Sequence, residues 1–282
     1  MQEDYGAAGI LDELVSANPV TDATGTYDNL GTLYLTILKN AFDIFRANAE
    51  RIQNIQKVLI WIAVSVGVMD VNGLGLIGIP SWAIRDTVNR LRSVLIVDGD
   101  ITPATEIREC HASFPQFLSD SARCTDPAFL VDPPSGHATI ATSLLDLLAR
   151  DDVDSLRDAD GNMPRMWVYA GLRWDGHLGV ARYTPELGRA LRGFVETHLE
   201  DWLQKKDTWD SPWDMAPLVD FCADVRTWYK NNGPDDGLAA ELDTIIDRRV
   251  EEIVAEAAQS PDKFRDRHLK QIKVWAEKGY TW

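Results

Sequence analysis

The chain has little of what disulfide-bonded, nucleic-acid-binding or membrane-spanning proteins need. Its three cysteines, Cys110, Cys124 and Cys222, make neither an even disulfide framework nor a Cys-x-x-Cys metal knuckle, which favours reduced thiols in the cytoplasm. The formal net charge of −16 opposes binding to nucleic acid or anionic lipid, because both need a basic surface. The most apolar run, residues 58–69, falls well short of the roughly 20 residues that span a bilayer, so we expect a buried core helix there. We therefore expect neither a nucleic-acid partner nor a membrane partner.

Sequence signatures of catalysis and metal binding are also missing. No Gly-x-Ser-x-Gly elbow and no Gly-x-x-x-x-Gly-Lys-Ser/Thr phosphate loop occurs in the 282 residues. The "DADGN" turn at 158–162 imitates a calcium loop, but Met163 stands where that loop needs glycine. His177 and His198 have carboxylates nearby in the sequence, yet not at the spacing that brings two ligands together on a helix. We predict no metal site, no cofactor held by the chain alone, and no enzymatic activity.

Apolar periodicity indicates a mainly α fold, and its first part has the order of a winged helix. Helices are predicted from Asn29 and over residues 51–69, and a third helix is predicted to begin with Ser81 as its N-cap. Two short strands are expected on either side of the turn at 98–100. Because helices followed by a β-hairpin are typical of a winged helix, we assign residues 29–120 to a winged-helix-like domain.

The remainder of the chain is predicted to be an α-helical domain over residues 121–282. Its clearest helix has Thr184 as N-cap and Pro185 at the first helical position, where proline is favoured. Further helices are predicted over 139–149, 166–179, 215–231, 236–258 and 261–278. We expect a helical bundle or a short helical-repeat domain. Residues 1–28 are expected to be poorly structured.

The stretch "GLGLIG" offers an alternative of a different class. Gly73, Gly75 and Gly78 match Gly-x-Gly-x-x-Gly, and Asp98 lies at the distance of the acidic residue that binds ribose in a dinucleotide site. This hypothesis, a dinucleotide-dependent oxidoreductase, requires residues 64–71 to form a strand of a parallel sheet. Since almost no strands are predicted after residue 112, we favour a flexible loop between two helices at this position.

A winged helix also raises the possibility of DNA binding through its third helix. Arg85, Arg90 and Arg92 would provide the basic residues. Three arginines in a strongly acidic chain are a weak basic footprint, and we interpret them as a solvated helix face.

Four segments, in the same order, resemble the region that follows the NTPase core in fungal NACHT-domain proteins, which are NOD-like-receptor relatives of the STAND class. The first three are "LGTLYLTILKNAF", "VNRLRSVLIVDGD" and "HASFPQFLSDSARCTDPAFLVDPPSGHATIATSLLDLL". The fourth is "WVYAGLRWDGHL", which is followed by "LRGFVETHLEDWL". The resemblance covers about residues 29–230.

This resemblance implies a role for His111. In such proteins the histidine of His-x-Ser-Phe lies in the winged helix and faces the β-phosphate of ADP held by the NTPase domain. The resemblance makes His111 a nucleotide-sensing residue, with Ser113, Phe114, Phe117 and Leu118 as structural anchors of the motif. A structural histidine is the alternative. Because the chain has no phosphate loop, it would contact ADP or ATP only when an NTPase supplied in trans binds the nucleotide. The implied function is a non-enzymatic regulatory or protein-interaction module in cytoplasmic signal transduction.

Overall fold

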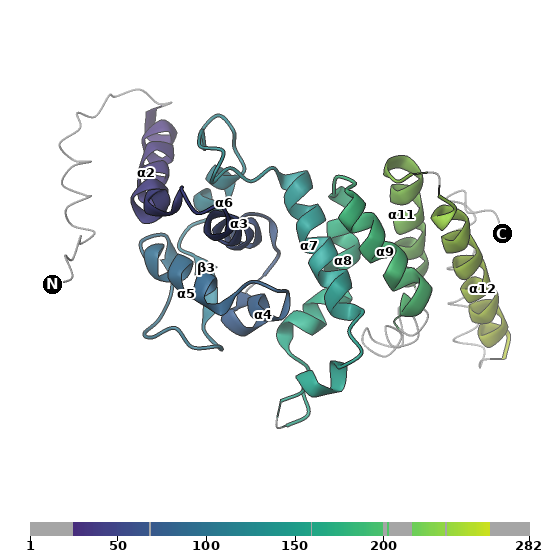
Figure 1. The fold of residues 1–282 in the computed structure, drawn as a ribbon. Coiled ribbons are helices and arrows are strands. Elements are labelled where there is room, and N and C mark those ends of the chain that lie inside the picture. Colours follow the sequence, from purple (N-terminus) through teal and green to yellow (C-terminus); the bar gives the residue numbers. More distant parts are fainter. Residues whose placement is uncertain are drawn as a thin grey trace. The chain divides into compact units, whose positions relative to one another are not determined.

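The computed structural model shows a mainly helical protein with one small sheet in its described part (Figure 1). It describes residues 25–259, apart from residues 68, 159, 200–201, 203–215 and 235. The chain divides into two compact units, Met1–Gly136 and His137–Trp282, which are described separately below. The predicted domain boundary at residue 120 stays a prediction. Residues 1–24 and the predicted helix at 261–278 lie outside the described residues. Residues 25–28, which were expected to be poorly structured, are helical, so the first described helix begins four residues before Asn29.

The first unit begins with helices that contribute part of its apolar core. These are α2 (Gly25–Phe42), the 3₁₀ helix η1 (Asp43–Phe45) and α3 (Ala49–Val64). α3 is capped by Asn48, whose side chain accepts a hydrogen bond from the Arg51 N–H at 3.0 Å. The predicted helix at 51–69 is too long at its end, because the backbone turns extended at Ser65. The expected burial within 58–69 is present at Val58, Leu59 and Trp61.

The glycine-rich stretch forms a helix, so the flexible loop predicted there is wrong. α4 spans Val71–Leu76, and the Asp70 carboxylate caps it by accepting from the Gly73 N–H at 2.6 Å. An aspartate at the N-cap stabilises a helix that its glycines would otherwise weaken. Gly78 then ends the turn with a φ of +83°, which glycine adopts without strain. α5 follows over Ser81–Arg90, and its N-cap is Pro80, one residue earlier than predicted.

Three short strands form an antiparallel sheet in the order β1-β3-β2. β2 (Leu95–Ile96) and β3 (Glu106–Glu109) are the two strands predicted around the turn at 98–100. β1 (Met69–Asp70) pairs with the other edge of β3, with Met69 opposite Ile107. β1 was not predicted, since a two-residue strand leaves no periodic pattern in the sequence.

A short helix after the sheet adds two phenylalanines and a leucine to the core of the first unit. α6 (Ser113–Leu118) buries Phe114, Phe117 and Leu118 almost completely. Beyond it, the carboxylate of Asp126 is buried and forms an ion pair with Arg46, which also pairs with Asp43 at 2.6 Å. This arrangement connects the segment after α6 to η1 and the residue that follows it.

All the regular secondary structure in the described part of the second unit is helical. α7 (Pro133–Leu148) begins just before the unit boundary and earlier than predicted, and η2 (Val153–Leu156) follows. The other helices are α8 (Arg165–Val180), α9 (Pro185–Thr197), α11 (Ala216–Asn232) and α12 (Leu238–Gln259). The Thr184 hydroxyl accepts from the Leu187 N–H at 3.1 Å, which confirms the predicted cap. α11 packs against both α8 and α12, and Figure 1 shows α11 and α12 side by side.

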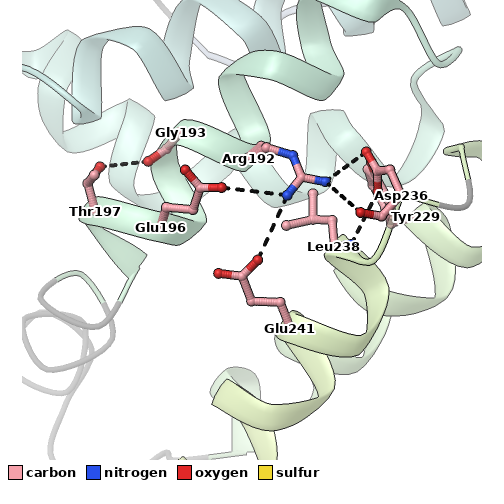
Figure 2. Close-up of polar contacts among 8 residues, drawn as sticks. All are labelled: Arg192, Gly193, Glu196, Thr197, Tyr229, Asp236, Leu238 and Glu241. Carbon is pink, nitrogen blue, oxygen red and sulfur yellow. Dashed lines mark hydrogen bonds and ion pairs between the residues drawn. The ribbon is translucent and has the colours of Figure 1, made fainter.

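The second unit is held by aromatic packing inside and by an arginine cluster nearer the surface. Trp174 meets Phe194 and Trp202 edge to face, with ring centroids 5.2 and 5.7 Å away. Figure 2 shows Arg192 of α9 reaching the carboxylate of Asp236 at 2.8 Å, just before α12. Arg192 also lies 3.5 Å from Glu196, and the Tyr229 hydroxyl donates to Asp236 at 2.8 Å. Arg192 lowers the pKa of Asp236 by its hydrogen bond. The cluster connects three helices.

None of the described helices is both long enough and apolar enough to cross a bilayer. This includes α3, which contains most of the apolar run at 58–69.

Candidate functional site

His111 lies exposed at the junction between β3 and α6, and a short polar chain fixes its ring. Nδ1 of the imidazole is 2.8 Å from the Ser113 hydroxyl oxygen. The backbone N–H of Ser113 also donates to Nδ1, at 3.1 Å. The Ser113 hydroxyl is in turn 2.7 Å from the hydroxyl of Tyr34. Nε2 of His111 has no hydrogen-bond partner among the residues that the structure describes.

The two residues behind His111 are deeply buried. Ser113 is 4% exposed and Tyr34 is 7% exposed. The Tyr34 ring contacts Phe114 and Phe117, with centroid distances of 5.2 and 5.4 Å. Tyr34 and Ser113 are 79 residues apart in the sequence, in the first and third of the segments that resemble NACHT proteins. Sequence reasoning named Ser113 as a structural anchor but did not connect it with Tyr34, because only the packing of α2 against α6 brings them together.

A pocket of about 350 Å³ opens beside this junction. The end of α3, the sheet and the beginning of α6 form its walls, and most of the lining is apolar. Arg108 and Glu109 of β3 give it a polar edge, and Arg108 is paired with Glu106 at 2.9 Å. Ala112, which lies between His111 and Ser113 in the sequence, and Pro115 of α6 are part of the wall.

The structure does not assemble a dinucleotide site from the glycine motif. Gly73 is buried inside α4, and its N–H is already bonded to Asp70, so it is not available to a pyrophosphate. Gly75 lies within α4 and Gly78 at its end, whereas Asp98 is exposed in the loop after β2. The hypothesis requires a parallel sheet with a strand over 64–71. Among the described residues of that range only Met69 and Asp70 are in a strand, and both strand pairings in the described part of the chain are antiparallel.

The arginines considered for DNA binding are mostly engaged within the first unit. Arg90 bonds the Asp86 carboxylate at 2.9 Å and the Ala41 carbonyl at 3.1 Å. Arg92 donates to the Gly99 carbonyl at 2.8 Å and so supports the turn between β2 and β3. Arg85 and Arg92 are both exposed, but of the three only Arg85 makes no such bond within the described part of the chain. Two of the three guanidinium groups therefore have structural partners.

The second unit contains a pair of histidines, the buried His177 and the half-buried His137, that was not predicted from the sequence. Nδ1 of His177 is 2.8 Å from Nδ1 of His137, and Nε2 of His177 is 2.7 Å from the Tyr169 hydroxyl. Burial, together with the nearby His137 and Arg173, lowers the pKa of His177 to about 4. Burial also lowers the pKa of His137. Both rings are neutral near neutral pH. No spacing signal marks this pair, because α7 and α8 contribute one histidine each.

These histidines do not join a set of metal ligands. No cluster of three or more histidine, cysteine or acidic side chains that could hold a metal ion occurs in the described ranges. His198 lies against the Phe194 ring, with centroids 6.5 Å apart. Among the cysteines, Cys110 is exposed, and burial raises the pKa of the Cys124 thiol to about 11, which keeps that thiol protonated. The side chain of Cys222 lies outside the described residues.

Comparison with models of known protein families, with curated proteins and with solved structures found no match to this chain.

Proposed function

We propose that the chain is a non-enzymatic regulatory and interaction module that contacts a nucleotide-binding NTPase of the NACHT type. In this proposal the first unit is a winged-helix arm. Its His111 approaches a phosphate of the ADP or ATP that the NTPase holds. The second unit is a helical bundle or short helical-repeat platform for protein contact. The NTPase lies outside these 282 residues. The unpaired Cys110 and Cys124 fit a reducing compartment, and we place the module in the cytoplasm.

The order of elements in the first unit supports the winged-helix assignment. Helices α3, α4 and α5 precede the β2–β3 hairpin, as the winged-helix order requires. β1 extends the hairpin to three strands. The engaged state of Arg90 and Arg92 favours a protein partner over DNA for this unit, as does the net charge of −16.

The observation that carries the proposal is the exposed His111 backed by a buried polar chain. Burying the hydroxyls of Tyr34 and Ser113 costs free energy that their hydrogen bonds must offset. The result is an exposed imidazole that is held at one nitrogen and open at the other. An imidazole N–H can donate to a phosphate oxygen in a closed assembly and lose that contact when the arm moves away.

A capture assay with defined nucleotides tests this proposal. The tagged chain is incubated with an extract of its source cells in ADP or in ATP, and recovered proteins are scored for a P-loop NTPase. That NTPase is then purified and its affinity for the chain is measured in each nucleotide. His111→Ala should weaken the ADP-dependent affinity roughly ten- to a hundredfold, the worth of one hydrogen bond to a charged group.

His198→Ala is the matched control, because His198 is a half-buried histidine of the second unit. It should leave capture unchanged. A titration of ADP into the chain alone should show no binding at micromolar concentrations. Micromolar binding by the chain alone, or equal ADP-dependent affinity for wild type and His111→Ala, would contradict the proposal.

A further inference from the structure

The hydrogen bonds of His111 determine which of its nitrogens carries the proton. The backbone N–H of Ser113 can only donate, and it points at Nδ1 from 3.1 Å. Nδ1 must therefore present its lone pair, and in the neutral ring the proton is on Nε2.

This assignment also determines which of the Ser113 and Tyr34 hydroxyls donates and which accepts in each hydrogen bond. Because Nδ1 is an acceptor, the Ser113 hydroxyl, 2.8 Å away, donates to it. The Ser113 oxygen keeps its lone pairs and accepts from the Tyr34 hydroxyl at 2.7 Å. The chain runs from Tyr34 O–H to Ser113 O–H to His111 Nδ1, and hydrogen bonds in such a chain strengthen one another.

We propose that Tyr34 and Ser113 are positioning residues for His111, which hold its ring so that Nε2–H is a fixed outward donor for an anionic oxygen. The tautomer and ring orientation follow from the contacts within the first unit. The identity of the anion as a nucleotide phosphate rests on the proposed function. The Tyr34 ring packs against Phe114 and Phe117 in the core, and this packing fixes the end of the hydrogen-bond chain that lies furthest from His111. Rotation of the His111 ring would break both bonds to Nδ1 at once.

Nuclear magnetic resonance of the imidazole nitrogens tests this inference on the whole chain, without nucleotide or partner. At a pH where the ring is neutral, His111 should show an unprotonated Nδ1 and a protonated Nε2. His198 is the internal reference, because its ring has no hydrogen bond within the described residues and should exchange between tautomers.

Two substitutions and a control measure how much the Ser113 and Tyr34 hydroxyls each contribute to the position of His111. Ser113→Ala removes the hydroxyl donor and should move the Nδ1 resonance furthest toward that of an unbonded nitrogen. Tyr34→Phe keeps the ring packing and should produce a smaller shift in the same direction. Ser119→Ala is the matched control, because the Ser119 hydroxyl bonds the Pro115 carbonyl at the other end of α6. It should leave His111 unchanged. If Ser113→Ala does not fold, Tyr34→Phe against Ser119→Ala decides the question.

Two substitutions at His111 test, in the capture assay, whether affinity depends on an N–H donor at the position of Nε2 or only on the presence of a polar side chain. A glutamine amide can place an N–H donor near the position of Nε2, whereas an asparagine amide reaches only as far as Nδ1. His111→Gln should therefore retain more of the ADP-dependent affinity than His111→Asn, by roughly tenfold, the worth of one hydrogen bond to a charged group.

The results that would overturn the inference are specific. A proton on Nδ1, tautomer exchange at His111 like that at His198, or equal Nδ1 resonances in Ser113→Ala and Ser119→Ala would each contradict it. If no NTPase is captured, the proposed function fails while the resonance data still decide the tautomer.

Discussion

His111 of the first unit and His177 of the second unit are both held by hydroxyl and nitrogen partners, but in opposite ways. His111 is exposed and bonded at Nδ1, with Nε2 left open. His177 is 4% exposed and bonded at both nitrogens, to His137 and to Tyr169. A histidine with both nitrogens occupied in the core contributes to packing, whereas one with an open nitrogen at the surface can bind. The difference shows that local surroundings, rather than residue type, decide which histidine is available to a ligand.

The largest expected change in stability is that of His177→Ala, which tests the structural role of His177. His177→Ala leaves a cavity between α7 and α8 and removes the partner of His137 and Tyr169. We expect the free energy of unfolding of the second unit to fall by roughly 4 kcal/mol, measured by urea unfolding followed by circular dichroism. A loss below about 1 kcal/mol would contradict the buried, doubly bonded arrangement.

The second prediction concerns the pH dependence of the same pair. His177 has a pKa of about 4 in the folded chain, well below the ordinary value of 6.5. The unfolded chain therefore binds a proton at higher pH than the folded chain, and protonation favours unfolding. Stability should be full above pH 6.5 and should fall as the pH drops from 6.5 to 4, by on the order of 3 kcal/mol at the lower limit.

The matched control for this pH effect is His177→Gln, which keeps a side chain of similar size that can bond Tyr169. The free energy of unfolding, measured in urea, should depend on pH differently in wild type and in His177→Gln only between pH 4 and pH 6.5. Acidic groups such as Asp126 and Asp236 have lowered pKa values and act below pH 3.8, so they do not produce the same profile. Equal profiles for both proteins would show that His177 is not buried as a neutral ring.

A smaller effect is expected from the polar chain of the first unit. Tyr34→Phe removes one buried hydrogen bond but leaves the contacts with Phe114 and Phe117. The free energy of unfolding should fall by about 1 kcal/mol, because Ser113 keeps its bond to His111. Thermal unfolding measures this, and Ser119→Ala provides the comparison. An unchanged stability would contradict a stabilising hydrogen bond between the Tyr34 and Ser113 hydroxyls.

The smallest effect should come from His111 itself. His111→Ala should change the free energy of unfolding by less than about 0.5 kcal/mol, because the ring is exposed and the Ser113 hydroxyl can donate to the Tyr34 oxygen instead. The same variant should lose the ADP-dependent affinity described above. A large loss of stability in urea unfolding would make His111 a structural residue like His177 and remove the contrast between the two units.

Much of the helical content could be predicted from the sequence, since amphipathic periodicity depends only on nearby residues. The helix after Thr184 and the two strands around the turn at 98–100 are confirmed. The glycine-rich stretch at 73–78 was mispredicted because glycine content outweighed one capping aspartate, Asp70, in the sequence analysis. Strand β1 was missed because its two residues depend on pairing with β3, which is distant in the sequence.

The candidate site shows the same division. His111 and Ser113 were selected from one motif, but their connection to Tyr34 required α2 and α6 to pack together. The pair of His137 and His177 had no sequence signal at all, because each histidine comes from a different helix.

The sequence alone determined the acidic charge, the mainly helical character and the absence of a phosphate loop, since these depend on composition and on short-range pattern. Only the tertiary structure decided which histidine is open to solvent and which is enclosed. Burial and hydrogen-bond partners come from residues far apart in the chain, and no local pattern records which distant side chains will meet.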